Sequence, residues 1–384
     1  MMRGAITQGC IAFLAVLTTF FLPAFVQARQ DAPPARDFEK LMEMNIDQLM
    51  EIEVTTPDWQ WEIVEQGGQV GDFSSIVIDG DGTPWIAYYD SANLNPKCAT
   101  YNGAAWETDV VFDIGNAGVG ASIGILSNGK PGISYLSATD ESVRWGLWNG
   151  SNWANSPINS DDGPFREITS MDQDSLGKTG VALVEQGGGD LFYGYHEGGP
   201  DWDWRRIDSD GDGFIEPCLA FDHADMPQIS VRGWSSESLK LVRWNGADWE
   251  VQTVASGGDI GRMSSLAFDY LGNPVIAHGD TALNLEWFNG VSWDHTTVDD
   301  SDQGRYPSLV LQDGRHPIIS YRHQAEGDLF MAWYKEGTWE IEELRTGSGS
   351  CSYTSIALDA LGNPVISLAY YYGGPRSLAV AWFK

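Results

Sequence analysis

The chain has 384 residues, of which 42% are hydrophobic and 12% aromatic, and its formal net charge is −32. This acidic balance argues against nucleic-acid binding, which needs a basic surface, and against docking on anionic lipid. The length is sufficient for two or three average domains or for one large repeat fold.

The first 28 residues have the pattern of a secretory signal peptide. Arg3 precedes the apolar run GCIAFLAVLTTFFLPAF, and VQA at 26–28 provides a small-residue cleavage site. We therefore expect an exported protein, periplasmic or extracellular, with no membrane span after cleavage. The mature chain keeps Cys98, Cys218 and Cys351, which allow at most one internal disulfide.

Residues 29–57 are interpreted as a linker followed by a short helix. The helical spacing of apolar residues is carried by Phe38, Leu41, Met42, Ile46, Leu49 and Met50. The stretch LMEMNIDQLMEIEVTTP resembles the short segment ahead of the plug domain in TonB-dependent outer-membrane receptors. The resemblance implies docking to an envelope partner, and the alternative is a helix that packs on the rest of the chain.

Residues 58–384 contain a repeat of about 47 residues. Anchor positions follow one another at spacings of 47, 48, 48, 47, 43 and 47 residues: Ser75, Ser122, Ser170, Cys218, Ser265, Ser308 and Ser355. A proline lies nine residues after six of these anchors, and Ile or Val lies eleven residues after all seven. Five anchors also have an aspartate four residues on: Asp79, Asp174, Asp222, Asp269 and Asp359. Such a period indicates a repeat architecture.

Each repeat has the pattern of four short antiparallel strands. SIVID and PWIAYYD predict two strands separated by a Gly-rich and Asp-rich turn. Asn-Gly turns such as YNGAAW and WNGADW predict a hairpin between the third and fourth strands, because both turn residues accept positive φ. The last repeat ends after its third strand, and WQWEIVEQGG before the first anchor supplies the missing one. The sequence therefore predicts an all-β, seven-bladed β-propeller whose last blade is closed by the N-terminal strand.

The repeat unit S-x3-D-x2-G-x-P-x-I-x-Y resembles the units of secreted bacterial seven-bladed β-propellers. The resemblance covers about residues 59–384 and implies the fold but no particular activity. The third repeat departs most, with Thr179 in place of proline and EGGPDW in place of the Asn-Gly turn.

The loop DSDGDGFIE at 208–216 is a candidate calcium site. Asp208, Asp210 and Asp212 alternate, and Glu216 lies at the ninth position, as in the short calcium loops of FG-GAP propellers, which this loop resembles. The alternative is an ordinary Asp-rich and Gly-rich turn without a metal. If calcium binds here, we expect a structural role.

One face of the ring is the candidate binding surface, because the loops that enter each inner strand and those that follow each second strand open on it. Aromatic residues with charged neighbours on such a face suit a sugar ring or a peptide. The candidate ligand-binding residues are Tyr88, Asp90, Tyr135, His278, Asp280, Tyr321, Arg322, His323, Arg305 and Tyr306. Phe73, Arg166, Arg262 and Tyr353 lie in the incoming loops.

From these features we predict a monomeric, non-enzymatic module that binds a glycan or an envelope protein. The alternative is a glycan-cleaving enzyme, sialidase-like or another hydrolase or lyase, with its site at the central channel. A structural module tethered through the lead helix is a third possibility. No catalytic residue is assigned, because 54 Asp and Glu residues leave too many carboxylate pairs to choose among.

Overall fold

The computed structural model describes residues 59–158, 163–198, 201–258, 260–301, 303–344 and 350–383. Within these ranges the chain forms 28 β-strands and no helix, and so none that could cross a membrane. The expected signal peptide and lead helix lie outside the described residues. The compact unit that contains the strands spans Asp58–Lys384.

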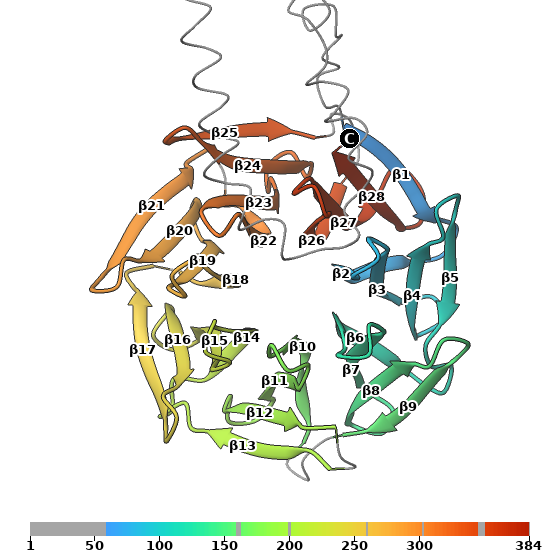
Figure 1. Ribbon diagram of the computed structural model, residues 1–384, viewed down its shortest axis with the longest axis horizontal. Helices are drawn as coiled ribbons and strands as arrows, with labels where there is room; N and C mark the ends of the chain where they lie inside the picture. The colour runs from blue at the N-terminus through green and yellow to red at the C-terminus, as the bar shows by residue number, and fades with distance from the viewer. Residues whose placement is uncertain are drawn as a thin grey trace, which may run out of the picture. The chain divides into compact units, whose positions relative to one another are not determined.

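The strands form seven four-stranded antiparallel sheets arranged as the blades of a ring (Figure 1). Residues of all seven innermost strands line a central cavity, the channel of the propeller. Blades 1 to 3 consist of β2 (Val70–Ile78), β3 (Pro84–Asp90), β4 (Asn95–Tyr101), β5 (Trp106–Val110); β6 (Ala117–Ile125), β7 (Pro131–Ser137), β8 (Ser142–Trp148), β9 (Trp153–Pro157); and β10 (Phe165–Gln173), β11 (Thr179–Glu185), β12 (Leu191–His196), β13 (Asp203–Ile207). Blades 4 and 5 consist of β14 (Phe214–Phe221), β15 (Pro227–Gly233), β16 (Ser238–Trp244), β17 (Trp249–Ala255); and β18 (Arg262–Phe268), β19 (Pro274–Gly279), β20 (Leu283–Phe288), β21 (Trp293–Asp299). Blades 6 and 7 consist of β22 (Arg305–Gln312), β23 (His316–Arg322), β24 (Leu329–Lys335), β25 (Thr338–Glu343); and β26 (Ser350–Leu358), β27 (Pro364–Tyr371), β28 (Ser377–Phe383), β1 (Trp59–Glu65).

Blade 7 is closed by the two ends of the described chain. The outermost strand β1 pairs antiparallel with β28, from Trp59 opposite Phe383 to Glu65 opposite Leu378. The predicted seven-bladed propeller with four-stranded blades and an N-terminal closing strand is therefore confirmed. Closure leaves no unpaired blade at a seam of the ring.

The hydrophobic core lies between neighbouring blades. At the junction of blades 1 and 7, for example, Ile86 and Ala99 pack with Val365 and Val380, and all four side chains are buried. The repeated Ile or Val eleven residues after each anchor is buried in one such cluster in every blade.

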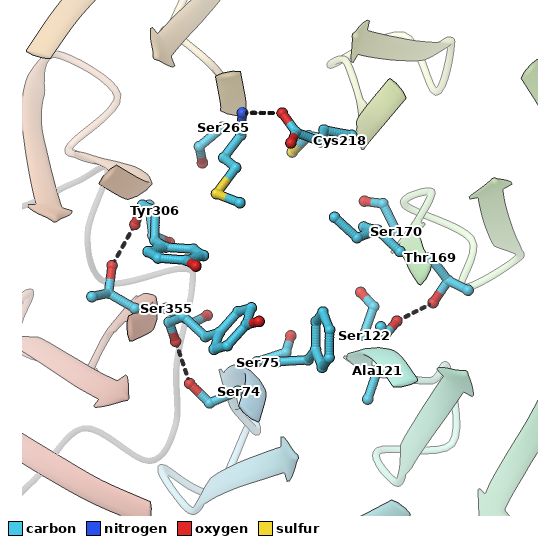
Figure 2. A pocket seen from close by; sticks show the side chains of 18 of the residues that line it. Ser74, Ser75, Ala121, Ser122, Thr169, Ser170, Cys218, Ser265, Tyr306 and Ser355 are labelled. Atoms are coloured by element: carbon cyan, nitrogen blue, oxygen red, sulfur yellow. Dashed lines mark hydrogen bonds between the residues drawn. The ribbon is translucent and has the colours of Figure 1, made fainter. Parts of the chain in front are cut away.

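The anchor residues lie around the channel (Figure 2), and hydrogen bonds link each one to the next blade. Each anchor side chain accepts the backbone N–H of the residue that follows the anchor of the next blade. The distances are 2.9–3.3 Å for the serines and 3.4 Å for the cysteine sulfur. The acceptors are Ser75, Ser122, Ser170, Cys218, Ser265, Ser308 and Ser355, and the donors are, in the same order, Ile123, Met171, Leu219, Leu266, Leu309, Ile356 and Ile76. The repeat of serine therefore has a structural cause.

The repeated aspartates hold the turn between the first and second strands of a blade. Asp269 accepts the backbone N–H groups of Leu271 and Asn273, each at 2.8 Å, and the indole N–H of Trp287 at 3.0 Å. Asp79, Asp174, Asp222 and Asp359 bond to the same two turn positions. Because these carboxylates accept the hydrogen bonds of their own turns, they are not candidates for a ligand-binding site.

The Asn-Gly turns differ from the expected hairpin in one respect. Only the glycine has positive φ, as at Gly103 with φ 91°, whereas Asn102 acts through its side chain. The Asn102 carboxamide oxygen accepts the backbone N–H groups of Ala104 and Ala105, each at 3.0 Å. The connection is thus a four-residue loop capped by asparagine rather than a two-residue turn.

Candidate functional site

One face of the ring, which we call the front face, carries the start of every innermost strand. Because the strands of a blade alternate in direction, the loops between second and third strands open on this face too. Just before its anchor, each innermost strand has an irregular register with its neighbour, for example between Arg305 and Ser308. These β-bulges turn the residue two before the anchor toward the channel.

Five of the bulge residues are not glycine and yet have φ between 48° and 55°: Phe73, Glu216, Met263, Tyr306 and Tyr353. A left-handed backbone costs such residues on the order of 1–3 kcal/mol each. All five line the central cavity, which has a volume of about 220 Å³, and Figure 2 shows the Tyr306 ring beside it. Strained residues gathered at one mouth point to a functional surface, because the strain contributes nothing to stability.

Three of these residues form a continuous aromatic wall. The ring centroids of Phe73 and Tyr353 are 4.5 Å apart, and those of Tyr353 and Tyr306 are 4.7 Å apart. Glu216 lies elsewhere on the lining, and its Oε2 accepts the backbone N–H of Met263 at 2.7 Å. The channel mouth is therefore aromatic over blades 6, 7 and 1.

A second cavity, which we call the blade 6–7 pocket, adjoins this wall and has a volume of about 440 Å³. It shares Tyr306 and Tyr353 with the central cavity. The complete lining is Gln69, Tyr306, Arg322, Ser350, Cys351, Ser352, Tyr353, Ala369, Tyr370, Tyr371 and Arg376. Two arginines and four tyrosines thus converge on one concave surface of a strongly acidic protein.

The two arginines keep donors available for a ligand. Arg376 pairs with the buried Asp72, but 44% of its side chain stays exposed. Arg322 lines the pocket, and its Nη1 makes only a long hydrogen bond of 3.4 Å to Gln324, whereas its Nε has no partner among the described residues but is buried. A planar guanidinium with free N–H groups suits a carboxylate or a sulfate.

The pKa values of two neighbouring groups are raised. Burial raises the pKa of the Asp72 carboxyl, although the charge of Arg376 opposes the shift. Burial, together with Tyr306 and the charge of Asp72, raises the pKa of the Tyr353 phenol. Tyr353 therefore keeps its proton at neutral pH and serves as a hydrogen-bond donor rather than as a base.

Exposed aromatic rings stand on the loops of the same face. Trp234 in blade 4 is 60% exposed, and Tyr371 and Tyr372 in blade 7 are 48% and 63% exposed. Arg232 lies 5.3 Å from the centre of the Trp234 ring. Exposed rings of this kind are platforms for the apolar face of a sugar.

The structure places three of the predicted residues inside the blades. Tyr88, Tyr135 and Tyr321 are each 0% exposed. Their hydroxyls donate to side chains of the protein, as Tyr135 does to Asn155 at 2.6 Å and Tyr321 to Asp299 at 2.7 Å. The phenol of Tyr88 donates to Glu65. These tyrosines therefore lie away from the open surface of the front face.

Other predicted residues lie near the front face but outside the blade 6–7 pocket. The carboxylate of Asp90 accepts two backbone N–H groups of its own loop, each at 3.1 Å. Arg305 donates to Gln303 at 3.1 Å, and the His323 ring stacks on Phe330. The remaining predicted residues separate into two groups: Arg322 and Tyr306 in the blade 6–7 pocket, and His278 and Asp280 in a cavity between blades 4 and 5.

The predicted calcium loop is divided between two places. Glu216 lines the central cavity, whereas Asp212 bonds to Ser236 and pairs with Lys240 at 3.0 Å. Asp208 accepts the backbone N–H of Asp210 at 2.8 Å. Over the described residues, the carboxylates close enough together to share a metal ion are those of Glu326, Asp328 and Glu343 instead. Calcium at 208–216 stays a prediction.

Sequence reasoning did not single out Arg376 or Tyr371. Both lie in the loop YYYGGPR of blade 7, which has three consecutive tyrosines where the other blades have polar turns. That run was the available signal. The cysteines Cys98, Cys218 and Cys351 are all free.

Comparisons with known proteins show the architecture. No protein-family model matches the chain, and no curated protein matches it. A protein of unknown function from Dyadobacter fermentans is 10% identical, with a TM-score of 0.54, over 85% of this chain and all of that one. YCF48 from Cyanidioschyzon merolae is 12% identical, with a TM-score of 0.54, over 83% and 98%. The polysaccharide lyase Uly1 is 10% identical, with a TM-score of 0.53, over 89% and 95%. At these identities, what the chain shares with the three structures is the propeller fold.

Proposed function

We propose that the protein is an exported module that binds an acidic glycan through the blade 6–7 pocket. The observation that carries this proposal is the pair Arg322 and Arg376 on a tyrosine-lined cavity of about 440 Å³, in a chain with a net charge of −32. Guanidinium groups would hold carboxylate or sulfate substituents, and tyrosines would contact the sugar rings.

Binding fits the pocket better than cleavage does. Tyr353 holds its proton, and Asp72 is occupied by its ion pair with Arg376. The polysaccharide lyase Uly1 shares the propeller architecture, so the fold itself is compatible with a glycan as ligand. The strain stored at Tyr306 and Tyr353 is consistent with a surface shaped in advance for a ligand.

The test is retention of the purified protein on polyuronates and sulfated glycans, each paired with a neutral counterpart such as methyl-esterified polygalacturonate. We expect retention on an acidic member and weak retention on its neutral counterpart. Arg322→Ala is expected to weaken binding by about 10- to 100-fold, the effect of one charge-assisted hydrogen bond. Arg205→Ala is the matched control, because Arg205 is an exposed, ion-paired arginine on β13.

Three outcomes would overturn the proposal. Equal retention on acidic and neutral glycans would remove the role of the arginines, and no retention on any acidic glycan would remove the ligand class. Release of new sugar ends during the assay would make the protein a glycan-cleaving enzyme instead. Because Arg376→Ala would leave Asp72 buried without its partner, that variant is made together with Asp72→Asn.

A further inference from the structure

Blade 5 contains a buried carboxylate where every other blade has a small or apolar side chain. Glu286 lies on β20 opposite Ile276, the repeated residue eleven positions after the anchor. Its side chain is 3% exposed. The residues at the same register in the other blades are Ala99, Gly146, Gly194, Val242, Ala332 and Ala381. The repeat therefore shows that the fold does not require a carboxylate at this position.

Two histidines meet this carboxylate on one face of the sheet. Glu286 Oε1 lies 2.7 Å from His295 Nδ1 on β21 and 3.4 Å from His278 Nε2 on β19. The three residues thus occupy three adjacent strands. The His278 side chain is 1% exposed, and its Nδ1 has no hydrogen-bond partner among the described residues.

The cluster opens on a cavity of about 480 Å³ between blades 4 and 5. Asp280, Asn284 and Thr297 line the same cavity with oxygen and nitrogen atoms. His295 is 58% exposed at the cavity rim. The site thus has a buried floor, polar walls and a route from solvent.

We propose that Glu286, His278 and His295 bind a divalent transition-metal ion of the Zn²⁺ class, at a site separate from the glycan pocket. Two imidazole nitrogens and one carboxylate oxygen form a ligand set that such ions prefer, and a fourth position would face the cavity. A bound cation would also compensate a carboxylate buried in the layer between two blades.

The geometry requires one movement. The three candidate ligand atoms do not all lie within 4.8 Å of one another. The pair formed by Glu286 and His278 is already at 3.4 Å, close to the roughly 3.3 Å between ligands of a tetrahedral ion with bonds of about 2.0–2.1 Å. The exposed His295 side chain closes the site by turning about its own bonds, without a change in the blade.

The experiment titrates Zn²⁺ into the full chain after treatment with chelator, and measures heat of binding together with the visible absorption of the Co²⁺-substituted protein. We expect one equivalent to bind, with a Co²⁺ spectrum of low coordination number. His295→Ala is expected to weaken binding by more than about tenfold. His223→Ala is the matched control, because His223 is an exposed histidine on the turn between β14 and β15.

Glu286→Ala separates a metal ligand from a packing residue. It restores the residue found in blades 1, 6 and 7, so the metal-free variant is expected to be as stable as the wild type. Metal binding should nevertheless be lost. The proposal is overturned if the wild type binds no Zn²⁺, if His295→Ala binds Zn²⁺ as tightly as the control His223→Ala does, or if Glu286→Ala keeps the Co²⁺ spectrum.

Discussion

Replacing one serine of the anchor ring tests whether these side chains hold the blades together. Ser265 Oγ accepts the backbone N–H of Leu309 at 3.0 Å, and Leu309 is 6% exposed. Alanine at position 265 keeps the backbone but leaves that N–H without its acceptor. A buried N–H without a partner costs about 1–3 kcal/mol. Since Ser265 borders the central cavity, water can reach the vacated position, so we expect a loss of about 1–2 kcal/mol.

Cys218 provides the converse change at an equivalent position. Its sulfur accepts the N–H of Leu266 at 3.4 Å, and a thiol is a weak acceptor. Cys218→Ser places the acceptor of the other six blades in this position, so we expect the free energy of unfolding to rise, by up to about 1 kcal/mol. The two variants should therefore shift stability in opposite directions.

Both shifts are measured by equilibrium unfolding in guanidinium chloride, followed by tryptophan fluorescence. Ser151→Ala is the control, because Ser151 lies in an exposed Asn-Gly turn, and a surface change of this kind is usually within about 0.5 kcal/mol of the wild type. A Ser265→Ala protein as stable as the control would refute the reasoning. So would a Cys218→Ser protein that loses as much stability as Ser265→Ala.

Three further predictions concern single side chains. Asp269→Ala should lower the free energy of unfolding by about 3 kcal/mol at neutral pH. Burial alone would raise the pKa of Asp269, but hydrogen bonds, those from Asn273 foremost, hold it below its ordinary value of 3.8. The contribution of Asp269 to the free energy of unfolding is therefore present above about pH 4 and is lost as the pH falls further. An Asp269→Ala protein with the acid sensitivity of the wild type would contradict this. Burial raises the pKa of Asp172 to about 6, so its ionisation lowers the free energy of unfolding as the pH rises from 4 through 6. Asp172→Asn should therefore be more stable than the wild type above pH 6, as measured by unfolding curves across this range. Tyr353→Gly should change stability by less than about 1 kcal/mol, because relief of the left-handed backbone offsets the lost ring contacts with Phe73 and Tyr306, but it should weaken binding to acidic glycans. A larger loss of stability would contradict this balance.

The sequence was sufficient for the architecture because the repeated residues report local packing. Seven anchors in register predict seven blades, and the structure gives each anchor the same hydrogen bond. The split blade was visible as well, since β1 supplies the strand that the last repeat lacks. These features depend on neighbours at fixed spacing, so one chain with seven copies reveals them.

The candidate site was harder to predict, and part of the difficulty was a matter of strand geometry. Tyr88 lies two residues after Ile86, so both point to the same side of β3, and Ile86 is buried between blades. The period of two therefore places Tyr88 in the core as well. Arg322 and Arg376 lie on different blades, and the spacing within a repeat does not show which loops meet at the front face.

The departures from the repeat carry more information about function than the repeat itself. Each blade solves the same packing problem, so the other six copies show which residues suffice at a given position. Glu286 stands where Ala, Gly or Val is enough. Tyr353 shares its left-handed backbone with the equivalent residues of four other blades, but blade 2 has Gly120 at this position, so the fold does not require a side chain there. Neither choice gains stability over the copies, because a buried carboxylate and a left-handed tyrosine both cost free energy. Residues retained at such a cost are best explained by a ligand, and in this propeller they lie at two separate cavities, for which we propose a metal ion and an acidic glycan.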